Sequence, residues 1–75
     1  MPQPRTFRDI IGLWPSAAQM ARDLATLERT VRKWRDRGSI PPEHYPAIIK
    51  AAQRRGFGAV TLELLHAIYT RRWAA

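Results

Sequence analysis

The sequence has no cysteine, few acidic residues and no long apolar run. Without cysteine, no disulfide can stabilise a chain of 75 residues, a size at which one hydrophobic core is barely sufficient. Zinc-finger and iron–sulfur ligand sets built on cysteine are excluded for the same reason. No apolar run approaches the ~18 residues that span a bilayer, and the N-terminal residues lack the apolar region of a signal peptide. We therefore expect a cytoplasmic protein that is neither exported nor inserted in a membrane.

The scarcity of acidic residues leaves a strong positive charge. Six acidic residues stand against thirteen lysines and arginines, which gives a formal net charge of +7. A small basic domain favours a polyanionic partner, with nucleic acid the first expectation and an anionic membrane surface the second. Six of the basic residues fall within residues 22–37. This clustering argues against a charge that serves solubility alone.

Apolar residues recur at helical spacing in five segments that proline, glycine and hydroxyl residues separate. The expected helices cover about 7–14, 17–25, 27–37, 47–55 and 62–72, with a single turn at 42–45. The expected N-caps of the first, second, third and fifth helices are Thr6, Ser16, Thr26 and Thr61. No segment shows the alternation of a strand. The sequence therefore predicts an all-α, compact five-helix domain over 6–72, between a flexible N-terminal arm (1–5) and a C-terminal tail (73–75).

The segment 27–37 combines an apolar face with a basic face. Leu27, Val31 and Trp34 fall within one narrow sector of a helix, so we expect all three to pack in the core. The other side carries charged residues, namely Glu28 at its edge and Arg29, Arg32, Lys33 and Asp36. Gly38 is a natural residue to end this helix. Such a helix is suited to lie against DNA.

The segment before it, 17–25, has a suitable length to brace this basic helix. Ser16 and Gln19 fit a capping box, in which the side-chain oxygen of each residue accepts from the backbone N–H of the other. The apolar stripe of the segment faces inward, and Gln19, Arg22 and Asp23 are expected on the outer face. The two segments and the short turn between them match the pattern of a helix-turn-helix.

Here the sequence resembles a known family. The residues Met20, Ala21, Leu24, Thr30, Val31 and Trp34 resemble the core of the Cro and repressor class of phage-type regulators, an XRE-like family. The segment 34–42 is similar to the W-x-x-x-G-x-I-P junction of its prophage Cro-like members. The resemblance covers about residues 10–65. It implies a lambda-repressor-like fold and a sequence-specific transcriptional regulator of bacterial, prophage or phage-derived origin, with helix 27–37 in the major groove.

The turn departs from the family pattern in two ways. Ala25 stands where the family has glycine, and Thr26 then Leu27 stand where an apolar residue and a serine cap are usual. An alanine in the left-handed conformation costs roughly 1–2 kcal/mol, so the turn is either strained at Ala25 or reshaped. The first turn of the following helix is accordingly placed only to within about one residue.

The resemblance implies two sets of DNA contacts. Contacts with bases in the major groove are expected from Glu28, Arg29, Arg32, Lys33 and Asp36. Contacts with phosphates are expected from Ser16, Gln19, Arg22, Arg35, Arg37 and Ser39. Some alternatives stay open. Glu28 can instead stabilise the helix N-terminus through the helix dipole, and Lys33 suits a phosphate better than a base. Ser16 and Gln19 can serve only as caps.

The family also suggests partners. Domains of this kind bind double-stranded DNA, commonly as homodimers on inverted half-sites about one helical turn apart. The expected dimer surface is the fifth helix and the tail, through Leu65, Ile68, Tyr69 and Trp73, unless that helix is used in the core. RNA polymerase or another regulator is a further candidate partner. No cofactor, metal or membrane is implied.

Other functions fit the sequence less well. The two histidines have no acidic or nucleophilic neighbour at a useful spacing, and phosphate-loop and H-E-x-x-H motifs are missing, so we do not expect an enzyme. A sequence-indifferent architectural DNA-binding protein is the main alternative, because charge alone does not exclude it. An amphipathic protein that binds a partner or a membrane surface is a weaker alternative, because the basic face lies opposite a narrow apolar stripe rather than beside a broad one.

Overall fold

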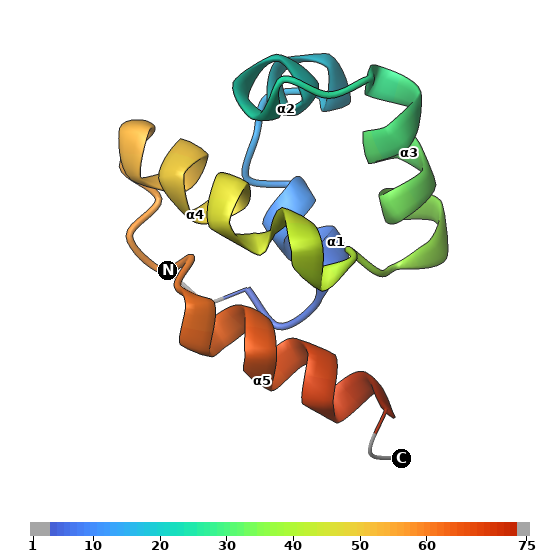
Figure 1. Cartoon of the computed structure of the whole chain (residues 1–75), viewed down its shortest axis with the longest axis vertical. Coiled ribbons are helices and arrows are strands. Elements are labelled where there is room, and N and C mark those ends of the chain that lie inside the picture. The colour runs from blue at the N-terminus through green and yellow to red at the C-terminus, as the bar shows by residue number, and fades with distance from the viewer. Residues whose placement is uncertain (1–3, 74–75) are drawn as a thin grey trace.

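The computed structural model describes residues 4–73, with side chains up to Arg71, as an all-helical domain (Figure 1). Its elements are α1 (Phe7–Ile11), α2 (Ala17–Leu24), α3 (Glu28–Arg37), the short 3-10 helix η1 (Pro42–His44), α4 (Tyr45–Arg54) and α5 (Leu62–Trp73). No residue in 4–73 belongs to a strand. The expectation of five helices in an all-α domain is therefore confirmed.

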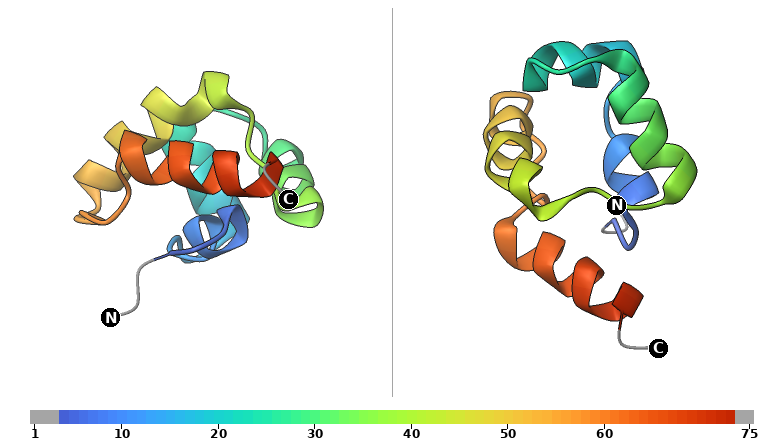
Figure 2. Two further views of the ribbon diagram at one scale, coloured as in Figure 1. Left: turned by 90° about the horizontal axis from the view of Figure 1, so that it is seen from below. Right: turned by 45° about the vertical axis from the view of Figure 1, so that its right-hand side comes forward.

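The helices surround a single core (Figures 1 and 2). α2 packs most extensively against α3, α1 also packs against α3, and α4 packs against both α2 and α5. Figure 1 and the right-hand view of Figure 2 place α2 and α5 at opposite ends of the molecule. The domain measures 32 × 24 × 22 Å along its principal axes. In this arrangement α3 lies along one edge of the molecule, with one side toward the core.

Every α-helix and three of the connecting loops contribute to the core. Phe7 packs against Tyr45 with ring centroids 6.0 Å apart, and Trp14 meets Phe57 edge-on at 5.1 Å. The buried apolar residues are Phe7, Ile10, Ile11, Trp14, Met20, Ala21, Val31, Trp34, Ile40, Tyr45, Ile48, Ala51, Ala52, Val60, Leu65 and Ile68. The predicted burial of Val31 and Trp34 is thus confirmed.

Hydroxyl side chains begin three of the helices, as predicted. Thr6 and Asp9 form a full capping box: the Thr6 hydroxyl accepts from the Asp9 N–H at 3.1 Å, and the Asp9 carboxylate accepts from the Thr6 N–H at 3.2 Å. The hydroxyls of Ser16 and Thr61 accept from backbone N–H groups three residues later, at 3.2 and 3.1 Å. Hydrogen bonds of this kind satisfy donors that a helix N-terminus leaves free.

Two predicted helix ends were wrong. α1 ends at Ile11 rather than near Trp14, because residues 13 and 14 donate to carbonyls three rather than four residues back. Pro15 follows, and a residue before proline is kept out of the α region. α4 begins at Tyr45, so Pro46 is its second residue; a proline there lacks only an N–H that the helix does not use.

Residues 4, 5 and 73 of the predicted flexible arm and tail belong to the folded domain. Pro4 is buried, the Arg5 N–H donates to the Asp9 carboxylate at 2.9 Å, and the Arg5 carbonyl accepts from Arg71 at 3.3 Å. The bond from the Arg5 N–H lowers the pKa of Asp9. Trp73 is the last residue of α5 rather than part of a tail. The rest of the predicted arm and tail, 1–3 and 74–75, lies outside the described residues.

Candidate nucleic-acid interface

A turn of three residues, 25–27, joins α2 to α3. Ala25 takes the left-handed conformation, with φ 54° and ψ 42°. The turn closes through two backbone bonds, from Ala25 to the Arg22 carbonyl at 3.2 Å and from Thr26 to the Ala21 carbonyl at 2.9 Å. Of the two forms that the sequence left open, the structure has the strained one. The turn therefore keeps the geometry that glycine would adopt without cost.

The start of α3 corrects the prediction for Leu27. The first helical residue is Glu28, and Leu27 is the N-cap, with extended backbone (φ −84°) and no side-chain cap hydrogen bond. The predicted cap, Thr26, does not hold this position. Leu27 is 55% exposed, whereas Val31 and Trp34 are buried as expected. The helical spacing of Leu27 was misleading because the helix and the core beneath it both begin after this residue.

The C-terminal end of α3 is fixed by local and distant contacts. Gly38 is left-handed (φ 66°), and its N–H donates to the Arg35 carbonyl at 3.2 Å. From α1, the Arg8 guanidinium donates to the carbonyls of Arg35 at 2.8 Å and Asp36 at 3.1 Å. A cation at this end is favoured by the helix dipole as well. Local sequence patterns could not predict the Arg8 contact, since Arg8 and Arg35 lie 27 residues apart.

All five residues predicted to contact bases lie exposed on α3. They are Glu28, Arg29, Arg32, Lys33 and Asp36. Glu28 and Arg32 form an ion pair at 2.7 Å across one helical turn. Their side chains stay 45% and 58% exposed, so water screens the pair and it contributes little to stability. The exposed face thus combines a paired arginine, Arg32, with the exposed cations Arg29 and Lys33.

The residues predicted to contact phosphates fall into two groups. Ser16, Gln19 and Arg22 lie on α2 and its cap, while Arg35, Arg37 and Ser39 lie at the end of α3. Within the second group, Arg37 and Ser39 join Lys33 around a hollow whose remaining wall is Trp34, Ile40, Pro41, Pro42 and Tyr69. The structure therefore brings two predicted phosphate ligands together with a residue that suits either role.

Gln19 does not behave as the predicted capping box requires. Ser16 provides its half of the box, but the Gln19 side-chain oxygen accepts from Arg55 at 3.4 Å. Arg55 follows the last residue of α4. The Gln19 amide oxygen is therefore turned toward a neighbouring helix end instead of its own.

Asp23 also departs from its predicted outward position. It is half-buried, it is ion-paired with Arg55, and its Oδ2 accepts from the Trp14 Nε1 at 2.8 Å. Hydrogen bonds from Arg55 and Trp14 hold the pKa of Asp23 below its usual value, and Asp23 in turn raises the pKa of Arg55. This cluster ties α2 to α4 and to the turn after α1. Sequence reasoning missed it because Arg55 is 32 residues away.

The predicted dimer surface on α5 is largely part of the core. Leu65 is 0% and Ile68 4% exposed, so these two side chains pack within the single chain and leave no surface for a partner. Tyr69 is 38% exposed, and the side chain of Trp73 lies outside the described ones. Leu62, the first residue of α5, is 48% exposed. Of the alternatives for the fifth helix, its use in the core is confirmed for two of the four residues.

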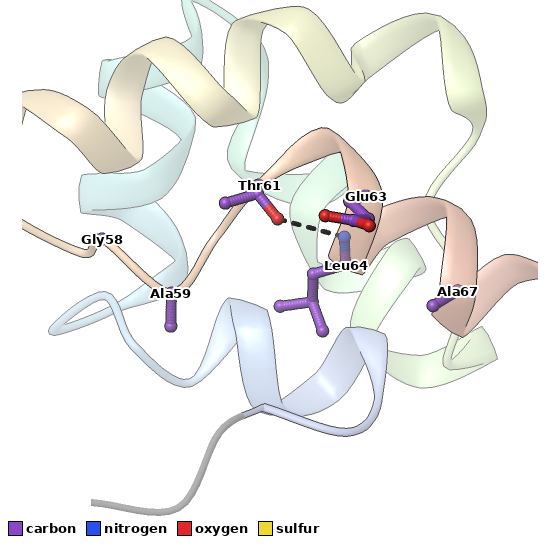
Figure 3. A pocket seen from close by; sticks show the side chains of 6 residues that line it. All are labelled: Gly58, Ala59, Thr61, Glu63, Leu64 and Ala67. Carbon is purple, nitrogen blue, oxygen red and sulfur yellow. Dashed lines mark hydrogen bonds between the residues drawn. The ribbon is translucent and has the colours of Figure 1, made fainter.

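A second hollow lies at the start of α5 (Figure 3). It is lined by Gly58, Ala59, Thr61, Glu63, Leu64 and Ala67. The Thr61 hydroxyl points to the Leu64 N–H that it caps, and Glu63 supplies the one charged side chain (Figure 3). A hollow lined by a carboxylate and no cation is unsuited to a phosphate. The basic hollow at the end of α3 is therefore the better candidate for contact with a polyanion.

Among the described side chains, no three of histidine, cysteine, aspartate or glutamate lie close enough together to hold a metal ion. Within the same part of the chain, each helix is too short or too polar to cross a bilayer. Comparison of the whole chain with protein-family models, with curated proteins and with solved structures finds no match.

Proposed function

We propose that the protein is a sequence-specific double-stranded DNA-binding transcriptional regulator of the Cro and repressor type, and that α3 enters the major groove. The observation that carries the proposal is the division of α3 into two sides. Val31 and Trp34 are buried, while the charged residues from Glu28 to Asp36 are exposed. The α2–turn–α3 unit, with its three-residue turn, has the connection typical of a helix-turn-helix.

The chemistry of the exposed face suits base edges. The major groove is wide enough for one α-helix, and arginine binds guanine there through two hydrogen bonds. Arg29 is exposed near the start of α3, the end that meets the bases in such motifs. Arg32 is oriented by Glu28, which can also accept from a cytosine amino group. Asp36 lies a further turn along the same helix.

Cations around the ends of α2 and α3 suit the phosphates beside the groove. Lys33, Arg37 and Ser39 surround the basic hollow, and Arg22 is exposed on α2. Phosphate contacts fix the orientation of a protein on DNA and supply most of its salt-dependent affinity. The net charge of +7 favours the same partner. Occupancy of a promoter, by a homodimer on inverted half-sites, is the proposed means of regulation.

A selection experiment tests this function. The full chain is used to enrich duplexes from a random pool, and affinities for the enriched and a scrambled duplex are compared at one salt concentration. We expect the enriched duplex to bind at least ~10³-fold tighter. Equal affinities would indicate the architectural alternative, and binding to anionic vesicles without binding to duplex would indicate the membrane-surface alternative.

Variants of Arg29 and Arg32 test whether α3 makes the contact with DNA. Arg29→Ala and Arg32→Ala should each weaken binding of the enriched duplex by about 1–3 kcal/mol and leave the melting temperature unchanged. Arg54→Ala is the matched control, because Arg54 is an exposed arginine on α4. Full affinity in both α3 variants would exclude this helix from the groove.

A further inference from the structure

Leu27 is the most exposed large apolar side chain in the described part of the chain. It is 55% exposed, compared with 48% for Leu62, 38% for Tyr69 and 36% for Leu13. The other three lie on α5 or in the turn after α1, whereas Leu27 adjoins the charged face of α3. A leucine with more than half of its surface exposed gains little from the hydrophobic effect. The packing of the domain therefore gives little reason for a leucine at this position.

The backbone conformation at Leu27 makes leucine still less favourable for the stability of the fold. Leu27 is the N-cap of α3, a position where serine, threonine, asparagine or aspartate would accept a hydrogen bond from the first turn. Leucine is among the poorest residues there, and α3 has no side-chain cap hydrogen bond. Two separate features, exposure and the lost cap, thus indicate that Leu27 serves something other than stability.

The position of Leu27 indicates a role in contact with DNA. Leu27 directly precedes Glu28 and Arg29, at the end of α3 that reaches the base edges in the proposed function. The C5 methyl of thymine is the one apolar group that a base pair presents in the major groove. We propose that Leu27 contacts a thymine C5 methyl and thereby selects a T·A pair at one position of the site. This inference rests on the proposed function.

Removal of single methyl groups from the DNA tests the contact directly. In the duplex enriched by selection, each thymine is replaced in turn by uracil, which keeps base pairing and loses only the C5 methyl. At one position we expect affinity to fall about fourfold, the change that corresponds to ~0.8 kcal/mol for one buried methyl. The Leu27→Ser variant should bind the uracil and thymine duplexes equally well.

Leu27→Ser is chosen because serine is a favoured N-cap residue, so the variant should melt at or above the temperature of the parent. Leu27→Ala, which has no cap, should lose the methyl effect in the same way. Leu62→Ala is the matched control: it also truncates an exposed leucine, but on α5, and should keep the fourfold effect.

The outcomes separate this inference from the proposed function. If no duplex is enriched, the proposed function fails, and the contact with thymine fails with it. If a duplex is enriched but no uracil substitution matters, or the effect persists in Leu27→Ser, the DNA-binding function stands and the role of Leu27 is wrong. A change of oligomeric state in Leu27→Ser would assign this side chain to a protein contact instead.

Discussion

At the scale of single residues, Ala25 carries a strain that the turn requires. It is the only residue other than glycine with positive φ in the described chain. An L-residue in this conformation costs the folded state roughly 1–2 kcal/mol, which glycine would avoid. Part of that gain is offset, because glycine also gives the unfolded chain more conformational freedom. Ala25→Gly should therefore raise the free energy of unfolding by about 0.5–1 kcal/mol, measured by urea denaturation.

The control for Ala25 is an alanine in ordinary helical conformation. Ala67 is exposed in the middle of α5. Ala67→Gly should lower the free energy of unfolding by about 0.5–1 kcal/mol, the usual effect of glycine in a helix interior. A change of the same sign at both positions would contradict the assigned left-handed turn.

The pair of Asp23 and Arg55 makes stability depend on pH. Hydrogen bonds from Arg55 and Trp14 lower the pKa of Asp23 in the folded chain, so its stabilising effect is full above the ordinary aspartate pKa. The effect is lost as pH falls through the lowered pKa. Asp23→Asn should be less stable than the parent at pH 7, and the difference should shrink as pH falls below about 4.

Urea denaturation of the parent and of Asp23→Asn, at pH 7 and below about pH 4, measures this difference in the free energy of unfolding. Arg55→Gln removes the other partner, and should cause a similar loss at pH 7. The double variant should lose less than the sum of the two single losses, since each substitution breaks the same pair. Strictly additive losses would show that the two side chains do not stabilise one another.

At the scale of elements, α3 depends on Trp34 for its position. Trp34 is 5% exposed, and its ring lies 4.7 Å from that of His44 in η1. Trp34→Ala should lower the free energy of unfolding by about 3–5 kcal/mol, because it leaves a cavity between α3 and the core. Lys33→Ala, at the exposed neighbouring position, should change stability by no more than ~0.5 kcal/mol. Equal melting temperatures for parent and Trp34→Ala would mean that this face of α3 is not buried.

At the scale of the whole molecule, the net charge of +7 should make the proposed DNA binding depend on salt concentration. The logarithm of the binding constant should fall linearly with the logarithm of salt concentration, by about 0.9 for each phosphate contacted. If Lys33 contacts a phosphate, Lys33→Gln should reduce the magnitude of this slope by about one. Lys50→Gln on α4 removes the same charge outside the proposed interface and should leave the slope unchanged. Equal slopes for all three proteins would exclude a phosphate contact by Lys33.

The helices and their caps could be predicted from the sequence better than the way the helices pack against the core. The caps at Thr6, Ser16 and Thr61 were predictable because each hydroxyl acts on a backbone donor three residues away. The buried face of α3 was predictable from the spacing of Val31 and Trp34. Helical periodicity says nothing of where a helix begins relative to the core. Leu27 fits the apolar pattern and yet precedes the first turn of α3.

The sequence by itself determined an all-helical domain and placed a basic face opposite the buried stripe of α3, since both follow from local spacing. Only the tertiary structure decided that Asp23 turns inward to Arg55, that Arg8 binds the end of α3, and that Leu65 and Ile68 are core residues. These depend on how segments distant in sequence pack. The largest correction is also of this kind: Leu27 is exposed because the core ends before the turn that carries it.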